Sequence, residues 1–448
     1  MGLRRVSLLV VLAAALTCAG GAAAAPQELT IAAADGTPLA CALVEPDGSP
    51  PDGGWPGLLL FHGLDSSHAD LEGDAETVFA PAGYASLMCD ARGTGGSGGS
   101  FGLDGPAEVQ DVRDLFAWLA ARPEVSDTRI GAVGVSLGGG AVWNAAAAGV
   151  PFAAIVPEAA RTGLATALAP QGLGKSGPAD RFAAKVPTER WDPELAAARA
   201  ALLGGGPLPA ALGAVRSARA RLAGLTVPTL IVQGRHDVLF GLDQALAAYG
   251  ALTGPKRLDV ADLGPSEHAA LLAETVAWLD RFVRGERNGV GSKASVVLAH
   301  DPWDGTATSY PGLPPTRMAS VTLPGRTTLI PGMRVSRGAR LTGGPNETFG
   351  APTVAVRYTG AHDWDRLVAQ VTLAGSRAPI AVGGARVGAE SGAVTIRLSS
   401  GSVRLPRERR LLVTVGATSP DGTYRAGVGP GARIEIGRLT LTLPLLRR

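Results

Sequence analysis

The sequence has few of the groups that signal a metal site or a nucleic-acid interface. Only three of its 448 residues are cysteine, and they show no spacing typical of metal ligands. The formal net charge is +2, from 41 basic and 39 acidic residues, so the charge balance does not favour nucleic acid or an anionic membrane as a partner. We therefore expect no metal site and no nucleic-acid partner.

Long apolar runs are also missing from most of the chain. After the N-terminus, no run approaches the roughly 18 apolar residues of a membrane span. Residues 1–25 predict a secretory signal, with Arg4 and Arg5 as its positive region, an apolar stretch at 6–16, and small residues before Pro26 for cleavage. We expect an exported protein, secreted or in the cell envelope, without a stable membrane span; an uncleaved anchor is the alternative.

Two cysteines lie outside that signal, Cys41 and Cys89, and both occur in strand-like runs. In an exported protein they could form a disulfide. Buried free thiols fit the same positions, because cysteine often packs as a small apolar side chain. The sequence leaves the two states open.

What the chain does have is 46% hydrophobic residues in two distinct patterns. From residue 29 to about 283, short continuous apolar strands alternate with helical segments, which predicts a mostly parallel sheet covered by helices on both faces. After a charged, Gly-rich linker at 284–292, short runs alternate apolar and polar residues between Gly and Pro turns, which is typical of a β-sandwich. We therefore predict a catalytic α/β domain at 26–288 and a β-sandwich at 289–448.

The most informative motif is the Gly-x-Ser-x-Gly around Ser136, which joins an apolar strand to an alanine-rich helix. This is the pattern of a nucleophile elbow, in which a sharp turn exposes the serine at the end of a sheet. The bare motif is weak in so glycine-rich a chain, and Ser97 and Ser100 match it too. These two lie in a loop by composition, so we identify Ser136 as the nucleophile. Residues 161–222, with short helices and Gly and Pro breaks, are interpreted as a cap over the site.

A serine hydroxyl needs a base within hydrogen-bond reach, and that base needs an orienting acid. In the α/β-hydrolase order the acid follows the serine and the histidine comes last. Asp237 follows one predicted strand and His268 follows the last one, at the strand ends where α/β sites collect. We assign Asp237 as the acid, with Asp262 as its rival, and His268 as the base. The other five histidines precede Ser136, adjoin the acid, or lie in the β domain.

The oxyanion of the tetrahedral intermediate needs hydrogen-bond donors. We expect the backbone N–H of Leu137, directly after the nucleophile, and that of Leu64, in the loop after the strand at 57–61. Hydrolysis by these groups requires no cofactor.

Two motifs carry a resemblance to a known family: Asp-x-Arg-Gly-x-Gly at 90–95, and Gly-x-Ser-x-Gly-Gly around Ser136, with a helix between them. Together they resemble the X-Pro dipeptidyl-peptidase and cocaine-esterase-like serine hydrolases over about residues 30–445. The resemblance implies an α/β-hydrolase core, a helical cap and a jelly-roll-like C-terminal domain. It also implies a structural role beside the site for Asp90 and Arg92.

By position, Ser136, Asp237 and His268 match the triad of that family. One difference concerns the oxyanion hole, to which these enzymes often contribute a tyrosine after the third strand. This chain has Phe-His-Gly-Leu there, at 61–64, without a tyrosine. An oxyanion hole made of backbone donors, as in generic esterases, is therefore expected.

The sequence leaves the substrate open between an N-terminal dipeptide and a small carboxylic ester. A dipeptidyl-peptidase must bind a protonated amino terminus, for which Glu158, Glu189 and Asp192 are candidate carboxylates, whereas an esterase needs only an apolar acyl pocket. An alternative hypothesis of another class is that the protein is catalytically silent and binds a ligand of the cell envelope through its β-sandwich. In that case Trp303 and Trp364 could contact the ligand.

Overall fold

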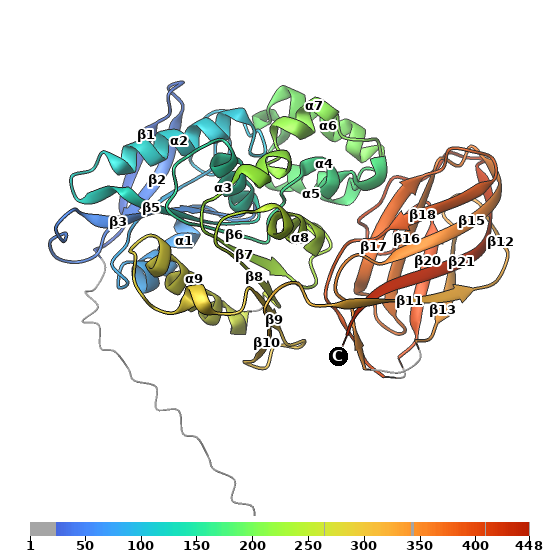
Figure 1. Cartoon of the computed structure of the whole chain (residues 1–448). Coiled ribbons are helices and arrows are strands. Elements are labelled where there is room, and N and C mark those ends of the chain that lie inside the picture. The colour runs from blue at the N-terminus through green and yellow to red at the C-terminus, as the bar shows by residue number, and fades with distance from the viewer. Residues whose placement is uncertain (1–23, 264, 342–344, 408, 448) are drawn as a thin grey trace, which may run out of the picture.

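The computed structural model describes residues 24–263, 265–341, 345–407 and 409–447. It consists of an α/β part, a set of helices above it and a β-sandwich beside it (Figure 1). The predicted signal peptide lies, except for its last two residues, outside the described residues.

A ten-stranded sheet forms the α/β part, in the order β1-β2-β4-β3-β5-β6-β7-β8-β9-β10. Pairing is parallel from β4 to β9 and antiparallel at both ends, so the predicted, mostly parallel sheet is confirmed. The strands are β1 (Gln27–Ala32), β2 (Pro38–Val44), β3 (Trp55–Phe61), β4 (Ala85–Cys89), β5 (Val125–Val135), β6 (Ile155–Glu158), β7 (Thr229–Gly234), β8 (Lys256–Ala261), β9 (Val296–Ala299) and β10 (Ala307–Tyr310).

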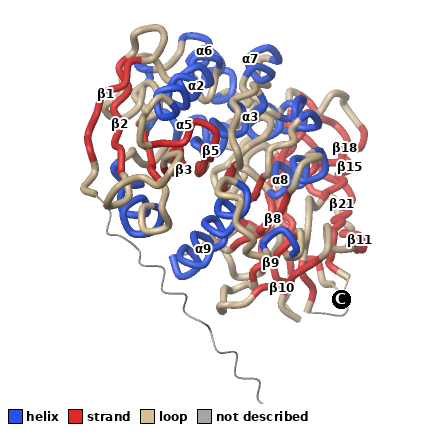
Figure 2. The backbone as a smooth tube through the Cα atoms, turned by 60° about the vertical axis from the view of Figure 1, so that its left-hand side comes forward, coloured by secondary structure: helices blue, strands red, loops and turns tan. Residues whose placement is uncertain are grey.

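Helices cover both faces of this sheet, as Figure 2 shows (blue on red). The sequence of β3 is apolar because both of its faces are covered. Leu59 packs with α2 and α3, whereas Leu58 and Leu60 pack with Trp278 of α9 on the opposite face. The covering helices are α2 (Pro106–Ala120), α3 (Leu137–Ala147) and α8 (Leu242–Ala251) on one face, and α1 (Ala69–Asp74), η1 (Ala75–Phe79) and α9 (Pro265–Phe282) on the other.

The predicted cap segment folds into short helices above the α/β part (green in Figure 1). Its apolar side chains form one buried cluster, to which the α/β part contributes Leu137 and Phe240. The cap therefore packs directly on the residue after Ser136. Its helices are α4 (Leu164–Leu168), η2 (Pro170–Gly172), α5 (Ser176–Lys185), η3 (Thr188–Arg190), α6 (Pro193–Leu203), α7 (Ala210–Val215) and η4 (Arg219–Gly224).

The sheet continues past the predicted domain boundary at residue 289. β9 pairs in parallel with β8, and β10 pairs with β9. Val296 and Leu298 are buried in the core of the α/β part. The predicted boundary at 289 would place residues 296–310 in the sandwich. They belong instead to the sheet of the α/β part. Strands of four residues do not reveal which of two sheets they join, because both sheets bury the same kinds of side chain.

Two antiparallel sheets form the sandwich, which is the predicted fold class. β21 is central: its inward side chains alternate, and a register shift in its pairing with β15 coincides with the step from Ile436 to Leu439. One sheet has β11 (Thr316–Leu323), β12 (Thr327–Leu329), β15 (Thr353–His362), β18 (Gly392–Arg397) and β21 (Arg433–Leu446); the other has β13 (Arg334–Ala339), β16 (Arg366–Leu373), β17 (Pro379–Arg386) and β20 (Leu411–Gly416). A small separate pair is β14 (Asn346–Glu347) with β19 (Arg404–Leu405).

The tryptophans considered as ligand contacts have different environments. Trp364 is only 3% exposed and packs in the sandwich core, so it is not a surface contact. Trp303 is half-buried in the loop between β9 and β10, outside the sandwich. The sandwich therefore lacks the surface tryptophans that the binding-protein reading would use.

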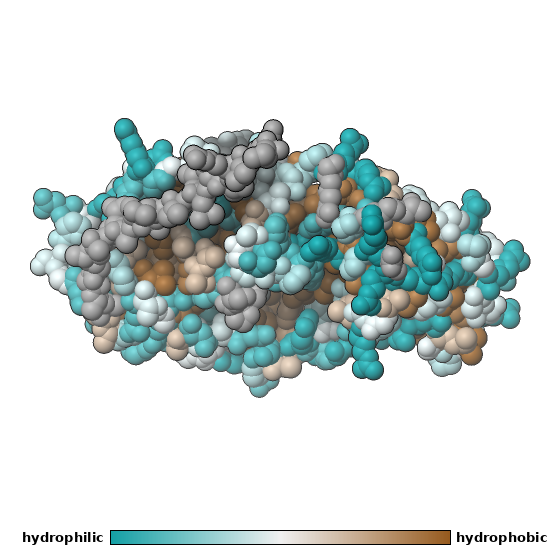
Figure 3. Space-filling view, turned by 90° about the horizontal axis from the view of Figure 1, so that it is seen from below, coloured by the Kyte–Doolittle hydropathy of each residue, from teal (hydrophilic) through white to brown (hydrophobic). Residues whose placement is uncertain are grey.

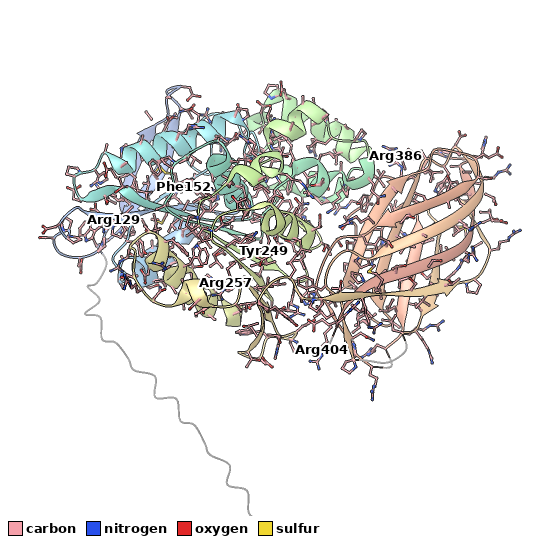
Figure 4. All side chains as sticks on the ribbon, viewed as in Figure 1. Arg129, Phe152, Tyr249, Arg257, Arg386 and Arg404 are labelled. Carbon is pink, nitrogen blue, oxygen red and sulfur yellow. A yellow bond between two sulfur atoms is a disulfide. The ribbon has the colours of Figure 1, made fainter. Side chains whose placement is uncertain are left out.

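The sandwich contacts both the cap and the loop after β9, through Arg386 and Arg404, which Figure 4 labels. The Arg386 side chain donates to the Gly205 carbonyl in the cap, at 2.6 Å. The Arg404 backbone N–H donates to the Asp301 carboxylate beyond β9, at 3.1 Å. The sandwich is thus tied both to the cap and to the edge of the sheet.

The structure decides the state of the two cysteines. Cys41 and Cys89 face each other in the antiparallel pair of β2 and β4, and they form a disulfide. They are far apart in sequence, so the hairpin had to be placed beside β4 before the pairing could be known.

The underside of the molecule mixes polar and apolar residues over both the α/β part and the sandwich (Figure 3). Among the described residues, no helix combines the length and the hydropathy needed to cross a membrane.

Candidate active site

Ser136 lies in the sharp turn between β5 and α3 that the motif predicts. Its backbone has φ 56° and ψ −107°, a strained conformation for a residue other than glycine. The flanking glycines are required, because a Cβ on Gly134 would lie 2.5 Å from the Gly138 carbonyl carbon, and one on Gly138 would overlap the Phe61 carbonyl. The glycines thus allow the strand to turn directly into the helix.

The other two motif serines have no such geometry. Ser97 is 1% exposed, and its hydroxyl donates to the Asp90 carbonyl at 2.7 Å and accepts from the Ala40 N–H at 3.0 Å. Ser100 is exposed in the same loop. Ser97 therefore holds the loop together, and the strand–turn–helix context separates Ser136 from both.

Asp90 and Arg92 brace this loop. The Asp90 carboxylate accepts the backbone N–H groups of His68 at 2.8 Å and Gly96 at 2.7 Å. The Arg92 guanidinium forms a two-pronged pair with Asp111, both side chains being buried. These contacts agree with the structural role implied by the resemblance.

The loop expected to supply an oxyanion donor is fixed against Ser136. The Gly138 N–H donates to the His62 carbonyl at 3.0 Å, and a Cβ on Gly63 would lie 3.7 Å from the Ser136 Cβ. Leu64 follows directly. Leu137 is the first residue of α3, where N–H groups have no acceptor within the helix. Leu137 and Leu64 thus each adjoin a residue that lies at the turn, and their role as oxyanion donors stays a prediction.

His62 is a structural residue of that loop. Its Nδ1 is 2.6 Å from the Gly63 carbonyl, and its Nε2 is 3.0 Å from the Ala91 N–H. Burial lowers the pKa of His62. A neutral ring that donates through Nδ1 and accepts through Nε2 satisfies both contacts, and it links the Asp90 loop to the loop before Leu64.

Asp237 lies in the loop after β7 and is half-buried. Its Oδ1 accepts the backbone N–H groups of Leu239 at 2.8 Å and Phe240 at 2.9 Å. Its Oδ2 is 3.4 Å from Gln233 Nε2, a long contact. Burial raises the pKa of Asp237. One oxygen thus fixes the carboxylate, and the other retains acceptor capacity.

His268 is not joined to Asp237 in this structure. It lies in the first turn of α9 with its side chain 60% exposed, and its Nε2 is 3.2 Å from Asp74 Oδ2. Neither Ser136 nor Asp237 is a hydrogen-bond partner of His268 among the described residues. The neighbouring Glu267 accepts the N–H groups of Asp262 and Leu263 at 2.7 and 2.8 Å. Glu267 thus ties the loop after β8 to the first turn of α9, next to His268.

Glu158 is the candidate carboxylate that lines a cavity with His268. The cavity has a volume of about 630 Å³ and is bounded by Val135, next to the nucleophile, and by Asp74 and Leu271. The Glu158 carbonyl accepts the Ser136 N–H at 2.8 Å. The other two candidates are placed differently: Glu189 is exposed, and Asp192 caps α6 by accepting from Glu194 and Leu195 N–H groups.

Replacement of Glu158 with glutamine should change the pH dependence of stability. Burial raises the pKa of Glu158 from 4.5 to about 7, against the opposing charge of His268. As pH rises, the Glu158 carboxyl therefore ionises in the unfolded chain before it ionises in the folded protein. The free energy of unfolding falls as pH rises from 4.5 to about 7. Above pH 7 the ionised carboxyl costs the folded state on the order of 3 kcal/mol. Thermal melts should show Glu158→Gln equal to wild type at pH 4 and more stable at pH 8.

Glu189→Gln is the matched control, because the same change on an exposed side chain should leave both melts unchanged. A Glu158→Gln protein that is less stable at pH 8 would show that the carboxylate is stabilised where it lies.

Comparison with known proteins agrees with this geometry. Residues 35–202 match the family model described as X-Pro dipeptidyl-peptidase (S15 family), a segment that includes the Asp90 loop and the elbow. The resemblance predicted from the two motifs is therefore confirmed over this segment.

Solved structures extend the likeness to nearly the whole chain, at the level of the fold. A CocE/NonD family hydrolase from Staphylococcus aureus aligns with a TM-score of 0.72 and 15% identity, covering 93% of each chain. An aminopeptidase from Thaumarchaeota archaeon gives 0.70 and 14%, covering 94% of this chain and 96% of its own. An α-amino acid ester hydrolase gives 0.66 and 14%, covering 95% and 97%. The combination of core, cap and sandwich is therefore shared.

Sequence relatives cover less of the chain. An uncharacterized 31.7 kDa protein from Escherichia coli is 36% identical over 93 residues, which is 20% of this chain. The matched segment spans about a third of that relative, or 32% of its length.

Proposed function

We propose that this protein is an exported serine hydrolase that cleaves a small carboxylic ester, or the N-terminal dipeptide of a peptide, through an acyl-enzyme on Ser136. The observation that carries the proposal is the strained turn at Ser136, placed between the start of α3 and the loop at 62–64. Strain of this kind persists where the surrounding structure enforces it, and it is common at nucleophiles.

In the proposed reaction, the Ser136 hydroxyl attacks the substrate carbonyl while His268 accepts its proton. The N–H groups of Leu137 and Leu64 stabilise the resulting oxyanion. The protonated His268 then gives its proton to the leaving alcohol or amine, and water hydrolyses the acyl-enzyme by the same route. For this cycle His268 exchanges its contact with Asp74 for one with the available oxygen of Asp237.

Ester hydrolysis is the form that the site supports best. The expected oxyanion donors are backbone groups, and the cavity next to the elbow has apolar walls that include Leu60, Leu271 and Leu272. A dipeptidyl-peptidase would in addition hold a protonated amine, and Glu158 is the candidate carboxylate that lines this cavity, together with Asp70 and Asp74.

A substrate panel tests the proposal. The purified mature protein is assayed with a short-chain p-nitrophenyl ester and with Ala-Pro-p-nitroanilide, and is incubated with a fluorophosphonate probe. We expect ester turnover and labelling of Ser136. Anilide turnover would favour a dipeptidyl-peptidase. No turnover of either substrate and no probe labelling would contradict the serine mechanism and favour the hypothesis of a binding protein.

Export is part of the proposal and has two supports. Residues 1–25 have the composition of a secretory signal. The disulfide between Cys41 and Cys89 is of a kind that persists in oxidising compartments. N-terminal sequencing of the protein recovered outside the cytoplasm would test it, with a mature start near Pro26 expected.

A further inference from the structure

The loop that carries Asp237 is hydrogen-bonded at both ends to the β-sandwich. We call residues 235–242 the acid loop and residues 400–402 of the sandwich the clamp segment. The Ser402 N–H donates to the Arg235 carbonyl at 2.9 Å, and the Leu242 N–H donates to the Ser400 carbonyl at 2.9 Å. The clamp segment therefore spans the acid loop from its first residue to its last.

Arg235 strengthens this connection with its side chain, which is 0% exposed. The guanidinium donates to the Ser402 carbonyl at 2.9 Å, to the Ala299 carbonyl at the end of β9, and to the Glu347 carboxylate of β14. A buried guanidinium is costly unless it is paired and its donors are used. Here its partners lie on three segments outside the acid loop, so the side chain joins those segments to the loop.

Two glycines allow the close approach of the two backbones. A Cβ on Gly241 would lie 3.0 Å from both the N and the O of Ser400. On the other side, a Cβ on Gly401 would lie 2.9 Å from the Arg235 carbonyl oxygen. The contact between acid loop and clamp segment thus has no room for even one added methyl group.

The cap holds the same loop from a third direction. The buried Lys175 ammonium donates to the carbonyls of Val238 at 3.0 Å and Leu239 at 2.9 Å. The next residue, Ser176, accepts the N–H groups of Arg425 and Ala426 from the sandwich at 2.7 and 3.1 Å. The cap segment that supports the acid loop is therefore itself attached to the sandwich.

We propose that the β-sandwich is a working part of the hydrolytic site, with Arg235 and the clamp segment as the positioning groups for Asp237. This inference rests on the proposed role of Asp237 as the orienting acid. The Asp237 carboxylate is fixed by N–H groups of its own loop, so a displacement of the loop moves the carboxylate with it. Displacements of about 1 Å can cost on the order of 100-fold in rate, because the base is then misoriented.

The decisive variant is Gly401→Ala, which adds a methyl group against the Arg235 carbonyl without touching the substrate site. Gly388→Ala is the matched control, because a Cβ there meets nothing within 4 Å. We expect Gly401→Ala to lower kcat on the p-nitrophenyl ester at least 10-fold, with KM changed less than 3-fold. Gly388→Ala should match wild type.

The pH profile separates positioning from mere loss of structure. A nearby carboxylate raises the pKa of the base it orients. The acidic limb of kcat/KM should therefore move to lower pH in Gly401→Ala, in the same direction as in Asp237→Asn. Arg235→Lys keeps the charge beside Glu347 but cannot reach all the partners of the guanidinium, and it should shift the limb in the same direction.

The outcomes distinguish this proposal from the proposed function. If Asp237→Asn is inactive while Gly401→Ala and Arg235→Lys keep wild-type kcat and pH profile, the positioning role is refuted and the acid assignment stands. If Asp237→Asn is itself fully active, the acid assignment fails first. A Gly401→Ala protein with a lowered melting temperature and an unchanged profile in its folded fraction would also refute positioning.

Discussion

Replacement of Ser136 with alanine is expected to lower kcat for the p-nitrophenyl ester by about 10⁵-fold or more. The variant lacks the oxygen that forms the acyl-enzyme, so only the oxyanion donors and substrate binding can contribute to the remaining rate. Folding should be preserved, since the removed hydroxyl lies at a turn enforced by Gly134 and Gly138. Initial rates and intact-mass analysis after probe labelling would measure the loss of turnover and of the covalent adduct.

The chain offers its own control for that experiment. Ser100 also lies in a Gly-x-Ser-x-Gly sequence but is exposed in a loop, so Ser100→Ala should keep wild-type rate and labelling. Ser97→Ala tests a different role, because it removes a buried hydroxyl bonded to Asp90 and Ala40 and should lower stability. Full activity of Ser136→Ala would show that the nucleophile lies elsewhere.

Replacement of Asp237 with asparagine is expected to lower kcat by about 10³- to 10⁴-fold at neutral pH. The amide keeps the size of the side chain, and its oxygen can still accept the N–H groups of Leu239 and Phe240. It cannot stabilise an imidazolium, and it favours the wrong tautomer of the base. Steady-state kinetics with the ester, at matched protein folding by circular dichroism, would measure the effect.

Asp262→Asn is the comparison for that variant, because Asp262 is the rival acid and lies six residues before His268. Its side chain is half-buried beside His236, at 3.7 Å, and we expect less than a 3-fold change in kcat. The opposite result, with Asp262→Asn inactive and Asp237→Asn active, would transfer the role of orienting acid to Asp262.

Much of the fold followed from local patterns. The strands β3, β4 and β7 are mostly apolar because both faces of the sheet are covered, and such runs are visible without coordinates. The boundary near residue 289 was wrong for the opposite reason. β9 and β10 are short strands of ordinary composition, and their membership of the sheet depends on β8 offering a free edge.

The candidate site divides in the same way. The turn at Ser136 and the position of Leu137 depend on residues within a few positions, where the glycines leave a single way for the chain to turn. The assignment of Asp237 and His268 relied on chain order alone. Chain order cannot show that His268 contacts Asp74 of α1 in place of Asp237.

By itself, the amino-acid sequence determined the class of the protein: a mostly parallel sheet, a serine elbow, a cap and a C-terminal sandwich. Short-range periodicity and the positions of the glycines are enough to predict these features. Only the tertiary structure decided the disulfide, the present partner of His268, and the attachment of the acid loop to the sandwich through Arg235. Those features join residues from about 50 to more than 190 positions apart. Such contacts arise from how finished elements pack, and no local pattern encodes them.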